Sequence, residues 1–474
     1  MVYRTARVGL RVTVGQRRRC FGLLVSAADV WSCVLDLARW RRQDGLPPVA
    51  GYQQLCRELA AAGPGTFGEL DSVGARSVLR RYSDAWFAAA KRRKDGGSSA
   101  RYPRRKRRLL PVRYYQGTFT VDGRRLRLPV ARGCPPLWVR LDRDVPYPAG
   151  QIRSVTIISE GGRLWVEVTA EVPVATYPPG AGPDPARVAG VDPGIIHPFA
   201  VAGPDGHGLV VSGRAIRAET RLHLSDTKQR AKATARRAPP PGRAQSRRWN
   251  KTRARQRDRE AAHRRRVRQA QHEAAAEVVG WCLSHWVGML KIGDPRGVLA
   301  LRAGRRHNKR VRDWRVAHLI GCLTGKAEQA GIVTVLVDER GTSSTCPDCR
   351  KRVPKPAGRV FRCRHCGFTG HRDLVGGANI ASRVPGGGSI WAGDRNRFPD
   401  QITHRRAGNH LPDASPARRD PRRRPHRGGT GGSFGRPRPA PPDVGTSLAN
   451  RARAGCEDHP APPGQPGKRW LTRH

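Results

Sequence analysis

Four cysteines form two closely spaced pairs, Cys346 with Cys349 and Cys363 with Cys366. Two Cys-x2-Cys pairs at this separation are typical of one tetrahedral zinc site, in which each pair forms a tight knuckle. Four thiolates fill the coordination shell and leave no position for water, so a zinc ion bound here is expected to be structural. A chance pairing or a redox-active dithiol is the alternative explanation.

Four carboxylates occupy positions from which they could meet in the folded chain: Asp192, Asp294, Glu339 and Asp373. Asp192 and Asp294 each end a short apolar run beside a glycine, while Glu339 precedes the cysteine pairs and Asp373 follows them. Acids at the carboxyl ends of buried strands can converge, and converged acids are typical ligands of divalent metal ions. Each acid also has a simpler explanation, because an aspartate before proline suits a turn and an acidic pair can cap a strand.

The elements that would carry these acids are predicted from short apolar runs. Residues 188–192, 199–202 and 209–211 predict three consecutive antiparallel strands with an acid on the first. Residues 287–292 and 333–337 predict a fourth and a fifth strand, each ending at an acidic position.

The rest of the chain predicts a separate N-terminal domain and a further helix. Helical periodicity in residues 26–42, 52–63 and 71–93 predicts a helical lobe. Period-two patterns in residues 110–175 predict short strands that form a small β-barrel with the N-terminal strand. Residues 309–329 predict one helix between the fourth and fifth strands of the acid-bearing domain.

The charge of the chain predicts a polyanionic partner. The net charge is +53 and the isoelectric point is about 11.6, and basic clusters at 101–108, 228–268 and 302–312 spread the excess along the chain. Such charge attracts nucleic acid. A ribosomal or histone-like protein would share the charge, but it would usually be shorter and would lack the acid constellation.

The sequence predicts no secretion and no membrane span. The N-terminus lacks a long apolar core, and no uncharged stretch reaches the 18 to 20 apolar residues that a span needs. The cysteines outside the two pairs are scattered, mostly in apolar surroundings, and are expected to be buried free thiols. A reducing cytoplasm is therefore the expected compartment.

Taken together, these motifs resemble the transposon-encoded TnpB proteins, RNA-guided DNA endonucleases related to the type V CRISPR effector nucleases. The resemblance covers about residues 1–385. It is carried by the strand-ending Asp192, by Thr-Ser-x-x-Cys-x2-Cys at 342–349 and by Arg-Asp-x5-Asn-Ile at 372–380. It implies a metal-dependent DNA endonuclease of a bacterial transposon, cytoplasmic and nucleoid-associated, with a guide RNA from the transposon end and target DNA as partners.

The resemblance also implies an α+β multidomain fold with an RNase H-like (RuvC) nuclease domain and an inserted zinc ribbon. The expected parts are a wedge β-barrel at 1–180 with a helical recognition lobe inserted at about 26–95, a RuvC-like domain at 186–345 with a basic helical hairpin at about 214–286, the zinc ribbon at 346–366, the end of the RuvC-like domain at 367–384, and a disordered basic tail at 385–474.

In this family two Mg²⁺ ions lie about 4 Å apart in the nuclease site. The resemblance assigns Asp192 the bridging role and Asp373 the second ion, while His371 stands where a carboxylate is common. The family usually has a glutamate at the end of the fourth strand, where this chain has Gly293 and Asp294. Either Asp294 substitutes for it or Glu339 reaches the same ions from the fifth strand; the longer side chain favours Glu339.

Two basic segments are candidates for contacts with nucleic acid. Each combines arginine or lysine with an aromatic ring, although a charged run can also be a solvated face. The candidates are Arg101, Tyr102, Arg104 and Lys106 in the first segment and Arg247, Arg248, Trp249 and Arg253 in the second.

Two other functions compete with guided cleavage. A chain without a complete set of acids would be a nuclease-inactive, RNA-guided DNA-binding protein or repressor. A transposase that acts on DNA directly is the third candidate, although no separate DNA-binding domain such as a helix-turn-helix is evident in the sequence.

Overall fold

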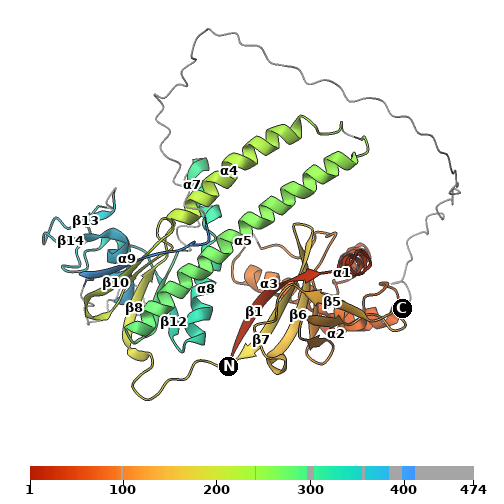
Figure 1. Cartoon of the computed structure of the whole chain (residues 1–474), viewed down its shortest axis with the longest axis horizontal. Coiled ribbons are helices and arrows are strands. Elements are labelled where there is room, and N and C mark those ends of the chain that lie inside the picture. The colour runs from red at the N-terminus through yellow and green to blue at the C-terminus, as the bar shows by residue number, and fades with distance from the viewer. Residues whose placement is uncertain are drawn as a thin grey trace, which may run out of the picture. The chain divides into compact units, whose positions relative to one another are not determined.

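The computed structural model of the chain describes residues 1–63, 65–97, 100–240, 242–295, 304–354, 358–383 and 398–411. These residues form two large β-sheets, a small two-stranded sheet and helices associated with each large sheet (Figure 1). The predicted α+β multidomain fold is confirmed at this level.

The first sheet is built around the N-terminal strand. Strand β1 pairs antiparallel with β7 over most of its length and with β5 at Leu10 and Arg11, so it joins two halves in the order β2-β6-β7-β1-β5-β4-β3. Among the described strands no pairing joins β2 to β3, so the expected barrel is a sheet with two edges here. The strands are β1 (Val2–Arg11), β2 (Val112–Tyr115), β3 (Thr120–Asp122), β4 (Arg125–Leu128), β5 (Leu137–Leu141), β6 (Ile152–Glu160) and β7 (Arg163–Val172).

Three helices are inserted between β1 and β2. They are α1 (Val14–Gln43), α2 (Tyr52–Ala61) and α3 (Ser72–Lys94). The predicted start of the first helix at residue 26 is wrong, because Thr13 caps a helix that begins at Val14 and forms a reciprocal capping box with Gln16 in its first turn. The polar first turns of α1 carry little apolar periodicity, which hid its beginning from the sequence.

Helix α1 is also long and apolar enough, by length and composition, to cross a membrane. Half of its most apolar stretch is buried inside the protein, and residues such as Leu23, Ala27 and Val30 are almost fully enclosed. The core helix of a soluble domain passes the same test, and the two aspartates Asp29 and Asp36 interrupt the stretch. We therefore treat α1 as a core helix.

The second sheet carries the candidate acids. Its order is β12-β11-β8-β9-β10-β15; the first three strands of that order are parallel, and β8, β9 and β10 form the predicted antiparallel meander. The carboxyl ends of β8, β11 and β12 therefore meet at one edge. The strands are β8 (Asp184–Asp192), β9 (Phe199–Ala202), β10 (His207–Ser212), β11 (Val287–Asp294), β12 (Val333–Asp338) and β15 (Gln401–Arg406).

The two faces of this sheet pack against different helices. On one face, Leu290 and Ile292 of β11 belong to a buried core with α5 (Arg247–Ser284) and α8 (Val316–Gln329). On the other face lies α9 (Arg372–Ala381), so close that a Cβ on Gly190 would stand 2.3 Å from the backbone nitrogen of Ala381. Because side chains alternate along a strand, this division decides which acids can share a face.

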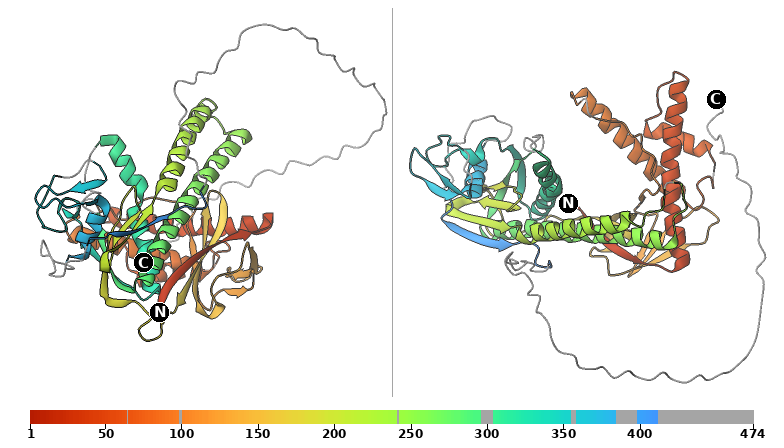
Figure 2. Two further views of the ribbon diagram at one scale, coloured as in Figure 1. Left: turned by 60° about the vertical axis from the view of Figure 1, so that its left-hand side comes forward. Right: turned by 90° about the horizontal axis from the view of Figure 1, so that it is seen from above.

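Helix α4 (Arg214–Ala235) and helix α5 form the predicted basic hairpin. The two helices run side by side in all views (Figures 1 and 2). The buried carboxylate of Glu219 joins them, since it lies 2.9 Å from His263 Nδ1 and accepts two hydrogen bonds from Arg266.

Two predictions in the second half of the chain need correction. The single helix at 309–329 is two helices, α7 (Gly304–Trp314) and α8, because Arg315 between them has a left-handed backbone with φ 50°. The stretch 398–411, predicted to be part of a disordered tail, contains β15, which pairs in parallel with β10. The rest of that predicted tail lies outside the described residues.

Candidate active site and nucleic-acid interface

Asp192 and Asp373 approach each other through a glycine contact. Asp192 ends the buried strand β8, and a Cβ on Gly376 of α9 would stand 2.5 Å from its Oδ2 atom. Only glycine permits this approach of helix to carboxylate. Asp373 lies in the first turn of α9, three residues before Gly376 and therefore on the same face of the helix. The helix thus brings the two acids to the same place.

The carboxylate of Asp373 has several basic partners. Its Oδ2 atom lies 2.8 Å from Nδ1 of His197 and 2.5 Å from a guanidinium nitrogen of Arg359. Burial opposes ionisation, but the hydrogen bond to His197 and the charge of Arg359 outweigh it and hold the pKa of Asp373 below its usual value. Asp373, His197 and His371 bring one potential ligand atom each within 4.8 Å of one another. This group could hold a metal ion.

Glu339 lies over the end of β11. This is the fourth predicted strand, at whose end a glutamate was expected and where the chain has Gly293 and Asp294 instead. A Cβ on Gly293 would stand 3.1 Å from Glu339 Oε2 and 3.3 Å from Glu339 Cβ. The last pair between β11 and β8 is Ile292 with Val191, and one further step places Gly293 beside Asp192. Paired residues of parallel strands share a face, so the Glu339 side chain occupies the space next to Asp192.

Asp294 belongs to the other face of the sheet by strand alternation. Lys291, three residues earlier, points to α9 and donates a hydrogen bond of 2.8 Å to the carbonyl of Ala381. Ile292 points to the opposite core, and Asp294 follows the same alternation as Ile292. The strand geometry therefore favours Glu339 over Asp294 as the neighbour of Asp192.

All four predicted acids nevertheless line one cavity of about 580 Å³. Asp192 and Asp294 come from strand ends, Glu339 from the loop after β12, and Asp373 from α9. Three guanidinium groups also line it, those of Arg340, Arg359 and Arg372. The cavity therefore combines acids that can hold cations with cations that can attract a phosphate.

The loop that carries Glu339 is fixed by side chains of α9 and the residues after it. Asn379, fully buried, donates hydrogen bonds of 2.6 and 2.7 Å to the carbonyls of Thr342 and Thr345. Arg383 donates to the carbonyls of Asp338 and Arg340, on either side of Glu339. The asparagine of the sequence motif thus has a physical role, which is to fix the loop between β12 and the first cysteine pair.

The four cysteines lie together as predicted. Their sulfur atoms are all within 4.8 Å of one another, with 3.6 Å between Cys346 and Cys366 and 3.5 Å between Cys349 and Cys363. Four sulfurs at about 2.3 Å from a tetrahedral zinc ion would be about 3.8 Å apart, so the arrangement fits zinc. The second pair belongs to the hairpin of β13 (Val360–Arg362) and β14 (Thr369–His371).

The first basic segment is partly occupied by contacts within the protein. The ring of Tyr102 stacks on Trp86 with centroids 4.9 Å apart, and Lys106 pairs with Asp36 at 2.8 Å. Arg101 and Arg104 are exposed. None of these four residues lines the large pocket described next.

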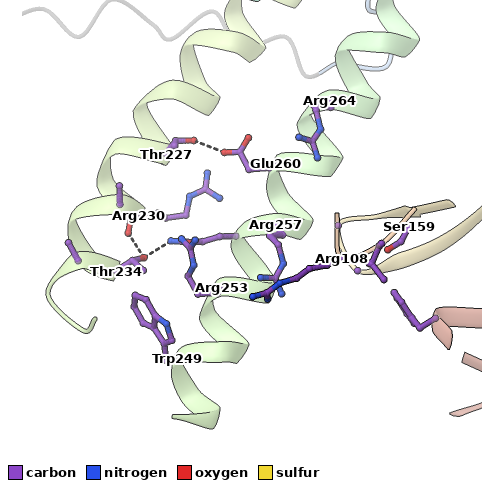
Figure 3. Close-up of a pocket in the computed structure, with 17 residues that line it drawn as sticks. Arg108, Ser159, Thr227, Arg230, Thr234, Trp249, Arg253, Arg257, Glu260 and Arg264 are labelled. Atoms are coloured by element: carbon purple, nitrogen blue, oxygen red, sulfur yellow. Dashed lines mark hydrogen bonds between the residues drawn. The ribbon is translucent and has the colours of Figure 1, made fainter. Parts of the chain in front are cut away.

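The second basic segment lines a pocket of about 1110 Å³ (Figure 3). Arg253 of α5 lies over the ring of Trp249, with 6.0 Å from its guanidinium carbon to the ring centroid. Arg257 lies one turn further along α5, and Arg108, at the end of the first segment, approaches from the other side of the pocket (Figure 3). The two predicted segments therefore meet at Arg108, while Arg247 and Arg248 are exposed at the start of α5.

Sequence reasoning missed three residues that shape the candidate active site. His197 follows Asp192 by five residues in the same Pro-Gly loop, and this proximity is a signal that could have been used. Arg359 and Arg383 gave no such signal, because arginine is abundant along the whole chain. Their roles depend on contacts between segments that are distant in sequence.

Comparison with known proteins gives the class of this fold. Residues 317–380 match the family model "Cas12f1-like, TNB domain". The solved structure "Cryo-EM structure of the Cas12f1-sgRNA-target DNA complex" aligns with a TM-score of 0.55 and 14% identity, covering 78% of this chain and 83% of the other. No curated protein matches the chain.

The chain therefore has the fold of a Cas12f1 effector and contains a Cas12f1-like TNB domain, which confirms the predicted resemblance to the TnpB and type V group. The structures of CRISPR-Cas_phi3 and of CasPhi-2 (Cas12j) bound to crRNA are also similar, with 11% identity each. They cover 78% and 79% of this chain and 90% and 96% of theirs, but their TM-scores of 0.37 and 0.36 add no argument.

Proposed function

We propose that the chain is an RNA-guided DNA endonuclease whose RuvC-like site hydrolyses phosphodiester bonds of target DNA. The observation that carries this proposal is the approach of Asp192, Glu339 and Asp373 to one cavity at the carboxyl edge of the sheet, in a chain with a Cas12f1 fold. The Cas12f1 structure is a complex with sgRNA and target DNA. A net charge of +53 suits the same two partners.

In this proposal Asp192, Glu339 and Asp373 hold two Mg²⁺ ions. Carboxylate oxygens are the protein ligands that Mg²⁺ prefers, and these three side chains provide them from three different elements. When bound, the ions supply an activated water and stabilise the leaving 3′ oxygen. Asp192 lies against Gly376 of α9 and, by strand register, beside Gly293, so it would be placed to serve both ions. Arg340, Arg359 and Arg372 line the cavity and would position the scissile phosphate.

Glu339, and not Asp294, is proposed as the middle acid, which is the metal-binding carboxylate that lies between Asp192 and Asp373 in the sequence. The side chain of Glu339 fills the space above Gly293, where the glutamate of related proteins would project. A carboxylate that arrives from the next strand can serve the same ions, because its longer side chain spans the distance between the strands. Asp294 projects from the face of β11 opposite to Gly293 and is assigned to the rim of the cavity.

The four cysteines are proposed to bind a structural zinc ion. The sequence between Glu339 and Asp373 contains both cysteine pairs and the β13–β14 hairpin. Zinc would therefore fix the segment that connects two catalytic acids, and its loss would loosen both of them.

The guide RNA is proposed to come from the transposon that encodes the chain. The pocket around Trp249 offers a ring on which a base can stack and several guanidinium groups for phosphates. Base pairing would select the target, while the protein would contact the heteroduplex shape and a short flanking motif.

One observation favours a second function, guided DNA binding without cleavage. Arg359 pairs with Asp373 at 2.5 Å and competes with a metal ion for that carboxylate. If the pair persists in the complex, the chain would bind DNA as a repressor.

The experiment that tests the proposal uses the protein purified with its own RNA. The complex is incubated with Mg²⁺ and a plasmid library that carries the guide-matched sequence. Cleavage by the wild type and none by Asp192→Ala supports the endonuclease. RNA-dependent binding of the plasmid without cleavage by the wild type supports the guided binder instead.

A further inference from the structure

Away from the active site and the cysteine pairs, three metal-ligating side chains converge between α5 and α8. They are His272 of α5 and His318 and Cys322 of α8, and each offers one ligand atom within 4.8 Å of the others. His318 and Cys322 are four residues apart and share one face of α8. We propose that these three residues form a second zinc site.

The distances fit a tetrahedral ion. Cys322 Sγ lies 3.8 Å from His272 Nε2 and 3.9 Å from His318 Nε2. A zinc ion at about 2.3 Å from sulfur and about 2.1 Å from each nitrogen would place sulfur and nitrogen about 3.6 Å apart. The two sulfur–nitrogen distances exceed this value by about 0.2 and 0.3 Å, a difference within the range of side-chain motion.

A buried glutamine prepares one imidazole for this role. Gln271 Oε1 lies 2.9 Å from His318 Nδ1, and the glutamine is only 4% exposed. A hydrogen bond from Nδ1 to this carbonyl fixes the tautomer whose lone pair is on Nε2. Metal-binding histidines commonly donate their second N–H to a carbonyl in this way. Because Cys322 Sγ lies 3.5 Å from Nδ1 and 3.9 Å from Nε2, the imidazole has to turn before Nε2 and the thiolate can share an ion.

The second imidazole is also in the form that binds metal. Although the side chain of His272 reaches solvent, its partial burial, with His318 and Lys326 nearby as further causes, lowers the pKa of His272 to about 4, so it is neutral at pH 7. Burial raises the pKa of Cys322 to about 11, so the thiol is protonated without metal. Binding would form the zinc–sulfur bond and release the thiol proton to solvent.

The donor set indicates which ion is bound and how tightly. Two imidazoles and one thiolate suit zinc, with the fourth position left to water because His272 is solvent-exposed. The nearby cations Lys326, Arg4 and Arg268 weaken the binding of a positive ion. The second zinc is therefore held less tightly than the zinc of the four cysteines, and a chelator removes it first.

The test is the zinc content of the untagged full-length protein after saturation with zinc and removal of the excess by gel filtration. The wild type is expected to hold about two zinc ions per chain, and Cys322→Ser and His272→Ala about one each. Cys134→Ser is the matched control, since Cys134 belongs to none of the groups of potential metal ligands among the described residues. This variant is expected to hold about two zinc ions per chain.

Two further measurements separate loss of metal from loss of fold. His272 is exposed, so His272→Ala is expected to melt at the same temperature as the wild type when both are in EDTA. Added zinc is expected to raise the melting temperature of EDTA-treated wild type further than that of His272→Ala. A wild type that holds about one zinc ion, or a His272→Ala variant with the zinc content of the wild type, overturns the proposal.

Discussion

Moving the middle acid back to the fourth strand tests the geometry of the candidate active site. Glu339→Ala removes the carboxylate that lies over Gly293, and Gly293→Glu supplies a carboxylate from β11 instead. A missing metal ligand weakens the stabilisation of transition-state charge by several kcal/mol, so Glu339→Ala is expected to cleave at least ~1,000-fold more slowly. The double variant is expected to recover at least ~10-fold of that loss.

The structure also sets the outcome of a smaller change at the same place. In Gly293→Ala the new Cβ would stand 3.1 Å from Glu339 Oε2 and 2.8 Å from Ile380 Cδ1, which forces the carboxylate aside by a few tenths of an ångström. Since a misplacement of about 1 Å can cost ~100-fold, a shift of a third of that size is expected to cost roughly 5-fold. Asp294→Ala is expected to stay within roughly 3-fold of the wild type, because strand alternation turns Asp294 away from Asp192.

The assay for this series is single-turnover cleavage of a guide-matched duplex by RNA-loaded protein, with saturating Mg²⁺ and equal RNA content in each preparation. Full activity in Glu339→Ala together with its loss in Asp294→Ala would show that Asp294, and not Glu339, is the required carboxylate. If the double variant cleaves no faster than Glu339→Ala and has the same melting temperature, a carboxylate at position 293 cannot take the place of the Glu339 carboxylate.

Four other predictions follow from particular contacts. Asn379→Ala leaves the carbonyls of Thr342 and Thr345 without their buried donor and is expected to lower the free energy of unfolding by about 3 kcal/mol, measured by denaturant titration. His371→Asp replaces an imidazole with a carboxylate, the ligand type that suits Mg²⁺, and is expected to shift the ratio of Mn²⁺-supported to Mg²⁺-supported cleavage roughly 10-fold toward Mg²⁺; an unchanged ratio would exclude His371 from metal binding. Trp249→Ala is expected to weaken RNA binding by roughly 5- to 100-fold in filter binding, whereas Trp138→Ala on β5, exposed but outside the pocket, is expected to have no effect. The pKa of Glu219 lies below its ordinary value of 4.5, because burial raises it but the hydrogen bonds from Arg266 and His263 lower it by more. The stabilisation by ionised Glu219 is therefore complete above pH 4.5 and is lost as the pH falls below that value. At pH 7 the free energy of unfolding of Glu219→Gln is expected to be lower than that of the wild type by roughly 1–3 kcal/mol, and the difference is expected to shrink below pH 4.5, measured by denaturant titration.

The strands that carry the candidate acids could be predicted because each is a short apolar run with a clear end. The runs before Asp192 and Asp294 form β8 and β11, and the proline-rich break after residue 238 falls between α4 and α5. In contrast, β15 could not be predicted, since its sequence from Gln401 to Arg406 is polar and charged, and its pairing with β10 alone makes it a strand.

The candidate site was predicted only as a set of possible acids. The sequence could not decide between Asp294 and Glu339, because the choice depends on which residues of β11 project to each face of the sheet and on which helix covers that face. Gly293 was visible in the sequence, but its meaning came from the Glu339 side chain above it. Arg359 meets Asp373 across 14 residues of chain and His197 meets it across 176, so neither contact could be predicted, although the position of His197 close after Asp192 was visible in the sequence.

RNA is proposed to direct where this chain cuts DNA. The most direct measurement replaces the targeting segment of the co-purified RNA with a new sequence and maps the ends of the cleaved plasmid. Guided cleavage predicts that the cut moves to the site that matches the new sequence and disappears from the old one, and that Asp192→Ala abolishes both cuts. A cut that stays in place, or that occurs without RNA, would contradict guided cleavage.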